Sequence, residues 1–269
     1  MLVSKGDYMI ARNDQGQLVY NGDTFKIVLQ RYSDPERLNS ARNAAIYLGK
    51  SDRDNTRRPL SIIKQGHVIE IFRGEYAEFE FIDVDKTTYD HIITYTTRNM
   101  RVAGGNRALT SDSYTIPSDK IKNSEAVSQA IDNSMWNYKQ LIELGETKQV
   151  ARSAMPTSAK MNPFVYQFNF VTLMQAVFPQ RIWEKGAQSN TTKVIKGMWE
   201  LVHSIDSELW DIAYDTFGVP AVEWKTVRSK LNKNKITTNQ LIDKLKENQL
   251  DMPLESVLRS MFGAQKSMW

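Results

Sequence analysis

The N-terminal part of the chain alternates between strand-like and helix-like hydrophobic patterns. Residues 8–12 and 17–20 are short apolar runs on either side of the polar turn 13–16, so they predict a β-hairpin. The Asn-Gly dipeptide at 21–22 is a second turn signal, and a third strand is expected at 25–29.

A helix should follow these strands. Asp34 can cap its N-terminus, and Pro35 suits the first helical position because no backbone N–H is needed there. Four apolar residues at helical spacing would share one face: Leu38, Ala41, Ala45 and Leu48. The pattern then predicts, in order, a polar loop at 52–60, a short helix at 61–65, an alternating strand at 75–84 and a helix at 87–97.

The second half of the chain has mainly helical periodicity. A helix capped by Ser124 should end near Gly145, and a nearly continuous apolar helix should span 164–177. A long amphipathic helix should span 193–217, because Gly-Val-Pro at 218–220 is a stop signal.

The pattern divides the chain into three parts: an N-terminal hairpin at 1–22, a main domain at 23–220 and a helical extension at 221–269. Further helices are expected from Thr238 and over 252–262. The apolar side chains of the extension should dock on the main domain or on a partner, and they include Met261, Phe262, Met268 and Trp269. The predicted fold class is α/β in the α+β sense, with a mixed or antiparallel sheet and long helices.

Composition narrows the function classes. With 269 residues, 41% of them hydrophobic and 25% charged, the chain is expected to be a soluble globular protein with one core domain. Its net charge of +4 is small, and the charged residues are spread along the sequence, which favours a small anionic ligand over nucleic acid. The sequence has no apolar run of about 18 residues and no signal-peptide pattern, so we expect a cytoplasmic protein without a membrane partner.

The absence of cysteine excludes disulfides, thiolate metal sites and cysteine nucleophiles. Of the three histidines, no two have the i, i+4 spacing of a zinc site, so no metal is predicted. His91 and His203 lie in apolar helical patterns and are interpreted as core histidines, whereas His67 follows a glycine before a β-like run.

Candidate anion-binding chemistry is concentrated between residues 98 and 107. Arg98, Arg101 and Arg107 surround a Gly-Gly dipeptide at 104–105, which can form a tight turn that presents guanidinium groups and backbone N–H groups to a phosphate. The alternative is a solvated loop.

Three further polar residues lie where apolar segments begin or end. Asn169 sits within the apolar run 164–177, so its amide should bond either to the backbone of a neighbouring segment or to a ligand. Arg152 precedes Met-Pro at 155–156, and Arg181 follows Pro179. Each is expected to end a helix, with its guanidinium able to reach inward.

The order of these motifs resembles that of the flavin-dependent thymidylate synthases over most of residues 25 to 218. The segments that carry the resemblance are the strand, Pro-capped turn and Ala-rich helix at 25–45, Gly66-His67, the Glu-led strand with alternating Phe at 75–81, the arginine-rich run at 98–107, Ala-Arg-Ser-Ala-Met-Pro at 151–156, and Asn169, Arg181 and Ala187-Gln188.

The resemblance implies a homotetramer that holds FAD between subunits. Such enzymes transfer a one-carbon unit from methylenetetrahydrofolate to C5 of dUMP, with reducing equivalents from NADPH. Their chemistry needs no protein thiol, so it is compatible with a chain that lacks cysteine.

The resemblance also implies roles for individual residues. Arg152 and Arg181 would be the catalytic residues that contact the pyrimidine deoxynucleoside monophosphate, and the other substrate-binding residues would be Arg101, Asn106 and Arg107. The residues that would bind the flavin are His67, Glu75, Arg98, Asn99, Asn169 and Gln175.

The chain departs from the family pattern near the cofactor. The family's Arg-His-Arg signature is replaced by Arg98-Asn99-Met100, or is shifted so that Arg101 supplies one arginine. Tyr76 replaces a histidine and Val171 replaces an arginine. These departures leave two alternatives open: a hydroxymethylase-type relative with altered cofactor use, and a non-catalytic nucleotide-binding or assembly protein.

Overall fold

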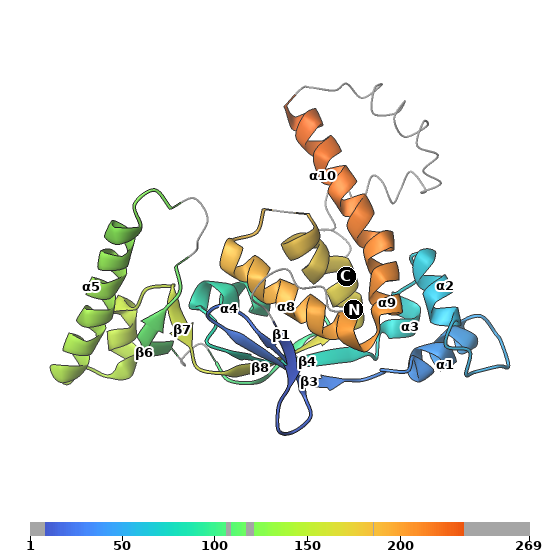
Figure 1. The fold of residues 1–269 in the computed structure, drawn as a ribbon, viewed down its shortest axis with the longest axis horizontal. Helices are drawn as coiled ribbons and strands as arrows, with labels where there is room; N and C mark the ends of the chain where they lie inside the picture. The colour runs from blue at the N-terminus through green and yellow to red at the C-terminus, as the bar shows by residue number, and fades with distance from the viewer. Residues whose placement is uncertain (1–8, 106–108, 117–120, 185, 234–269) are drawn as a thin grey trace.

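A computed structural model describes residues 9–105, 109–116, 121–184 and 186–233 (Figure 1). Its main sheet has six strands in the order β1-β2-β3-β4-β8-β5, and all neighbouring strands are antiparallel. The strands are β1 (Met9–Arg12), β2 (Leu18–Asn21), β3 (Lys26–Tyr32), β4 (Tyr76–Ile82), β8 (Phe164–Asn169) and β5 (Met100–Ala103). A smaller antiparallel pair consists of β6 (Leu109–Tyr114) and β7 (Ala159–Met161). The predicted α+β class with an antiparallel sheet is confirmed.

Alternating aromatic residues form the core between β4 and β8. Phe79 pairs with Tyr166 and Phe81 with Phe164 across the two strands, and all four side chains are buried. The stacked Phe81 and Phe164 rings lie 4.9 Å apart between centroids. Because side chains alternate between the faces of a strand, the polar residues between these aromatics point to the opposite face.

Helices cover the sheet and flank it on both sides (Figure 1). The main helices are α1 (Leu38–Tyr47), α2 (Arg58–Lys64), α3 (Ile69–Phe72), α4 (Lys86–Ile93), α5 (Ser124–Glu143), α6 (Lys148–Ala151), α8 (Ser189–Ile205), α9 (Ser207–Ala213) and α10 (Val219–Asn232). Helix α8 can approach β2 and β3 closely because it carries Gly197. A Cβ at this position would lie 2.7 Å from the ring of Tyr20 and 3.0 Å from Ile27.

The predicted helix at 164–177 is wrong in its first part. Residues 164–169 form strand β8, and α7 (Phe170–Thr172) and a π-helical turn (Leu173–Val177) follow. Phe164, Tyr166 and Phe168 alternate with half-buried residues, which is the period of a strand. No turn residue separates them from the apolar helix, so the sequence pattern merged the two.

The predicted helix at 193–217 is also wrong as a single element. Asp206 interrupts it, since its carboxylate accepts the backbone N–H of Leu209 at 3.1 Å and caps α9. Beyond α9, a π-helical turn (Tyr214–Gly218) leads directly into α10, so the expected stop at 218–220 does not end the helical structure. Pro220 is tolerated because it lies in the first turn of α10.

Smaller differences concern how segments begin. Helix α1 starts at Leu38, not at Pro35; Asp34 accepts the backbone N–H groups of Asn39 and Ser40 at 3.0 and 2.9 Å. Asn123, and not Ser124, caps α5. The region predicted as a glycine loop after Arg98 begins as strand β5 and turns at Gly104, whose φ is 82°.

Two groups of elements lie on opposite sides of the central sheet (Figure 1). Helix α5 with β6 and β7 lies at one end of the view, and α1, α2 and α3 lie at the other. The hairpin of β1 and β2 continues the main sheet as its edge, and the three-part division of the chain stays a prediction. The helices expected from Thr238 and over 252–262 fall outside the described residues. Measured over the described ranges, every helix is too short or too polar to cross a lipid bilayer.

Candidate functional site

The turn at 94–99, between α4 and β5, joins the central elements. The Tyr166 hydroxyl of β8 donates to the backbone carbonyl of Tyr95 at 2.9 Å. The Asn99 amide donates to the carbonyl groups of Tyr95 and Thr97 at 2.9 and 2.8 Å, and its Oδ1 accepts the backbone N–H of Asn169 at 2.8 Å. These bonds fix the turn against the end of β8.

Asn169 connects three segments through its side chain. Its Nδ2 donates to the carbonyl groups of Phe72, Arg73 and Glu75 at 3.3, 2.7 and 2.9 Å, and its Oδ1 caps α7 by accepting the Val171 N–H at 3.0 Å. The residue is only 4% exposed. The sequence predicted that this amide bonds either to the backbone of a neighbouring segment or to a ligand. The structure shows the backbone bonds, and a contact between Asn169 and a flavin stays a prediction.

Two arginines are anchored by the tyrosine hydroxyls of α4 and of the turn that follows it. Arg181 Nε donates to the Tyr95 hydroxyl at 2.8 Å, and the guanidinium lies 5.6 Å from the centre of the Tyr95 ring. On edge strand β5, Arg101 pairs with Tyr166 and donates from Nη1 to the buried Tyr89 hydroxyl at 3.1 Å. We refer to Arg101 and Arg181 as the arginine pair.

Among the residues that the structure describes, the arginine pair retains unused donors. A guanidinium has five N–H donors, and each of these groups gives one to a tyrosine. Within the described ranges, neither arginine forms an ion pair with a carboxylate. Each guanidinium is therefore suited to contact an anion, since planar forks bind phosphate in a bidentate manner.

Glu75 lies next to this cluster and is 5% exposed. Its Oε2 accepts the Ser33 hydroxyl at 2.6 Å, and Ser33 Oγ in turn accepts the backbone N–H of Tyr76 at 2.9 Å. Burial raises the pKa of the Glu75 carboxyl. The side chain thus joins β3 to β4 by bonds within the chain.

The other predicted flavin residues, His67, Arg98 and Gln175, are exposed. His67 is in the turn between α2 and α3, with its ring 6.1 Å from that of Tyr47. Arg98 has a positive φ of 61° in the turn before β5, and Gln175 is in the π-helical turn after α7.

The remaining predicted substrate residues lie outside the central cluster. Arg152 follows α6, where its Nε donates to the Lys148 carbonyl at 3.2 Å, and α6 packs against α5. Asn106 and Arg107 fall outside the described residues. Within a single copy of the protein, the central cluster therefore contains Glu75, Asn99, Arg101, Asn169 and Arg181. Arg152 lies with α6 against α5, and His67 lies between α2 and α3; α5 and these two helices are at opposite ends of the molecule (Figure 1).

Tyr89, Tyr95 and His91 were missed as site residues. His91 is partly exposed, and its Nδ1 lies 2.8 Å from Thr191 Oγ1. The signal in the sequence was the i, i+4 spacing of His91 and Tyr95, which places both on one face of the helical segment. His203 also differs from a core residue, because it is 33% exposed and its Nε2 lies 2.9 Å from Asp211 Oδ1.

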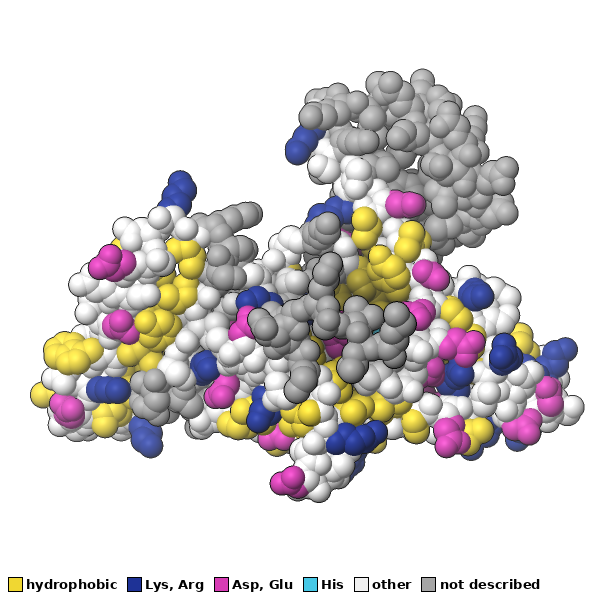
Figure 2. All heavy atoms as spheres, viewed as in Figure 1, with side chains coloured by type: hydrophobic (Ala, Val, Ile, Leu, Met, Phe, Trp, Pro, Cys, Tyr) yellow, Lys and Arg dark blue, Asp and Glu magenta, His cyan; other side chains and the backbone are white. Residues whose placement is uncertain are grey.

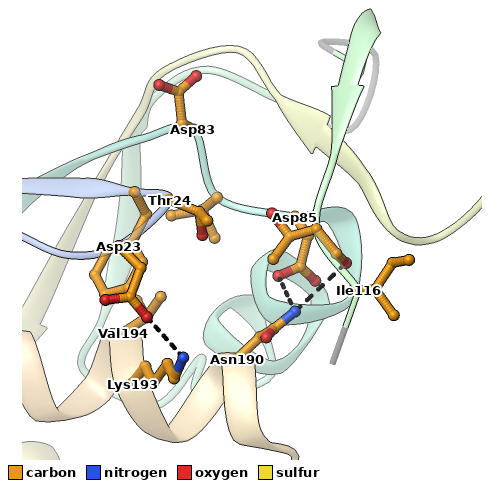
Figure 3. A pocket seen from close by; sticks show the side chains of 11 residues that line it. Asp23, Thr24, Asp83, Asp85, Ile116, Asn190, Lys193 and Val194 are labelled. Carbon is orange, nitrogen blue, oxygen red and sulfur yellow. Dashed lines mark hydrogen bonds and ion pairs between the residues drawn. The ribbon is translucent and has the colours of Figure 1, made fainter. Parts of the chain in front are cut away.

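A separate cavity of about 210 Å³ lies between the β2–β3 turn, the β4–α4 loop and α8 (Figure 3). None of the predicted site residues lines it. Asp85 and Asn190 lie on one side of it, and Asp23 forms an ion pair with Lys193 at 2.8 Å on the other. Burial raises the pKa of the Asp85 carboxyl. The cavity is smaller than most ligand pockets, which measure about 300–1,000 Å³.

Comparisons with known proteins identify one family and one similar fold. The family model described as thymidylate synthase complementing protein, Thy1, matches residues 30–206. A similar solved structure is a UMP/dUMP methylase PolB from Streptomyces cacaoi bound with 5-Br dUMP, with a TM-score of 0.53 and 14% identity over 72% of this chain and 96% of that one. At this identity the likeness shows the fold alone. Among curated protein sequences, none matches this chain.

Proposed function

This chain belongs to the family of thymidylate synthase complementing proteins, and we propose that it is an enzyme that adds a one-carbon unit to C5 of a pyrimidine deoxynucleoside monophosphate. The substrate is proposed to be dUMP or a close relative. The family membership supports this reaction class, and the ligand named for the structural neighbour supports the substrate class.

The observation that carries the proposal is the arginine pair. Both guanidinium groups lie within the matched range 30–206, are oriented by tyrosines, and lack a carboxylate partner among the described residues. A nucleotide monophosphate is a compact dianion whose oxygens match such forks. We assign Arg181 and Arg101 to the nucleotide, and Tyr95 and Tyr89 to the orientation of these side chains.

The cofactor is proposed to be FAD, with methylenetetrahydrofolate and NADPH as co-substrates. His67, Arg98 and Gln175 fit a dinucleotide because their imidazole, guanidinium and amide groups are exposed. Glu75, Asn99 and Asn169 fit it less well, since their side chains are engaged in hydrogen bonds within the chain. When bound, the flavin would supply reducing equivalents for the reduction of the transferred carbon.

A complete site is proposed to form between chains of a homotetramer. Arg152 and His67 lie on opposite sides of the central sheet, so a second copy is needed to bring either one to the arginine pair (Figure 1). Helix α5 also presents exposed apolar side chains, of which Trp136 is 60% exposed. Figure 2 shows hydrophobic side chains along the inner side of the end of the molecule that carries α5. Such a surface is typical of one that is covered in an assembly.

A second candidate is nucleotide binding with altered or absent turnover, including a hydroxymethyl product. One observation favours it. Asn99 and Met100 replace part of the family's arginine signature; the Asn99 amide is engaged in the turn, and Met100 is 53% exposed and cannot donate a hydrogen bond.

The test is to incubate purified protein with FAD, NADPH and labelled methylenetetrahydrofolate, with dUMP or dCMP as acceptor. Mass spectrometry of the nucleotide distinguishes a methyl from a hydroxymethyl product. A labelled methyl product with either acceptor supports the first candidate, and a labelled hydroxymethyl product supports the second. Tight nucleotide binding without a labelled product supports the second candidate, and the absence of binding refutes both.

A further inference from the structure

A chain of buried polar groups crosses the interface between α4 and α8. Thr88 Oγ1 donates to Asp85 Oδ2 at 2.9 Å, and it lies 3.4 Å from Thr191 Oγ1. Thr191 Oγ1 lies 2.8 Å from His91 Nδ1. Asp85 is 4% exposed, and both threonines are 0% exposed. Four side chains that would be costly to bury alone are thus linked from a carboxylate to an imidazole.

The positions of the hydrogen atoms in this series of hydrogen bonds can be assigned by starting from the Asp85 carboxylate. Asp85 accepts three donors, which are the N–H and the hydroxyl of Thr88 and the amide of Asn190 at 3.4 Å. Figure 3 shows the Asp85–Asn190 contact beside the cavity. With each of these three contacts supplying a donor, we assign Asp85 as the ionised carboxylate, which accepts hydrogen bonds and donates none. The single hydroxyl hydrogen of Thr88 is therefore used, and Thr88 Oγ1 can only accept from Thr191.

The same reasoning assigns the hydrogen on the His91 imidazole. When Thr191 donates its hydrogen to Thr88, its oxygen is left to accept one from His91 Nδ1. A neutral histidine with a hydrogen on Nδ1 has a lone pair on Nε2. In the part of the chain that the structure describes, Nε2 has no hydrogen-bond partner.

His91 also lies beside the proposed nucleotide site. It is four residues before Tyr95, which holds Arg181, and the hydroxyl of Thr192, next to Thr191, donates to the Arg181 carbonyl at 3.3 Å. Burial first, and then the Arg181 charge, lower the pKa of His91, while Asp85 and Asp90 oppose this effect. The imidazole is therefore neutral near pH 7 and can serve as an acceptor.

We propose that the Asp85–Thr88–Thr191 chain fixes His91 as the Nδ1–H tautomer, and that Nε2 accepts the N3–H of a uracil ring and so selects uracil over cytosine. Uracil has a hydrogen on N3, whereas neutral cytosine has a lone pair there that would face the lone pair of His91. His91 is the specificity-determining residue, and Thr191 is a positioning residue that acts through it. This inference rests on the proposed nucleotide function.

The tautomer can be tested without any ligand, by nitrogen NMR of protein with labelled histidine. The chain has only three histidines, so His91→Gln identifies the His91 signals by their loss. The wild type should show Nδ1 protonated and Nε2 bare. Thr191→Val should shift His91 toward the other tautomer, and Thr191→Ser should retain the wild-type signals. Thr94→Val is the matched control, because Thr94 donates to the His91 carbonyl and not to its ring. A protonated Nε2 in the wild type overturns the inference, even if no variant folds.

The selectivity is tested by titration calorimetry with dUMP and dCMP. The wild type should bind dUMP at least about tenfold more tightly than dCMP, the scale of one hydrogen bond and one unpaired group. His91→Gln and Thr191→Val should reduce this ratio about five- to tenfold, and Thr191→Ser and Thr94→Val should keep it. Unchanged ratios in the first two variants overturn the role of His91 while the proposed function stands. A wild type that binds neither nucleotide refutes the proposed function itself.

Discussion

Replacement of Asn169 by alanine should destabilise the fold more than a single surface change can. The amide has two hydrogens that bond buried carbonyl groups of residues 72, 73 and 75, and its oxygen caps α7. Two such bonds contribute about 1 kcal/mol each, and the cap contributes about 1 kcal/mol more. Because the carbonyl groups would stay buried without donors, we expect Asn169→Ala to lower the free energy of unfolding by about 3 kcal/mol.

Urea unfolding followed by circular dichroism measures this loss. Asn123→Ala is the control, since Asn123 also caps a helix, with a 3.0 Å bond to the Ala126 N–H, but is exposed. It should cost about 1 kcal/mol. Both measurements are made on protein without added flavin. If the two variants unfold at the same urea concentration, then Asn169 is not the structural connector described above, and a ligand contact becomes its main role.

The other predictions concern the arginines, one carboxyl and one helix face. Arg181→Ala and Arg101→Ala should each weaken dUMP binding by about 1.5–3 kcal/mol in calorimetric titrations, which is the scale of a charged hydrogen bond. Arg152→Ala should have the same effect if a partner chain supplies Arg152 to the site. A variant with unchanged affinity would show that the replaced arginine does not contact the nucleotide. The raised pKa of Glu75 means that the folded state binds this proton more tightly than the unfolded state, so stability should fall as the pH rises through the folded-state pKa. Glu75→Gln should remove that part of the decline in thermal midpoint as the pH rises above about 4, and an identical pH profile would contradict the reasoning. Trp136→Glu should convert the tetramer to smaller species in light scattering; a wild type that is already monomeric would refute the assembly.

The strands before residue 84 could be predicted because one face of each is buried. The buried residues of these strands lie in short runs bounded by polar turns, so the two-residue period of a strand can be recognised; they include Val19, Ile27, Phe79 and Phe81. Strand β8 was missed because its last residue runs into an apolar helix without a turn residue. The break at Asp206 could have been predicted, since Asp is a favoured N-cap residue and the glutamate two positions later suits the first turn of a helix.

The candidate site was predictable only in part. The sequence pattern singled out Arg101, Asn169 and Arg181, but their roles came from the resemblance of motifs, because a charged residue in a turn carries little information by itself. The partners that orient them were not found. Tyr89, His91 and Tyr95 look like ordinary helix residues until α8 and the segment around Arg181 pack beside them, and contacts between residues that far apart in the sequence have no local pattern.

The most direct test of the proposed reaction is release of tritium from dUMP labelled at C5. Substitution at C5 replaces this hydrogen whether the product carries a methyl or a hydroxymethyl group. We predict that the protein, given FAD, NADPH and methylenetetrahydrofolate, releases tritium to water, and that Arg181→Ala does so much more slowly. Saturating binding of dUMP without any release of tritium would contradict the account.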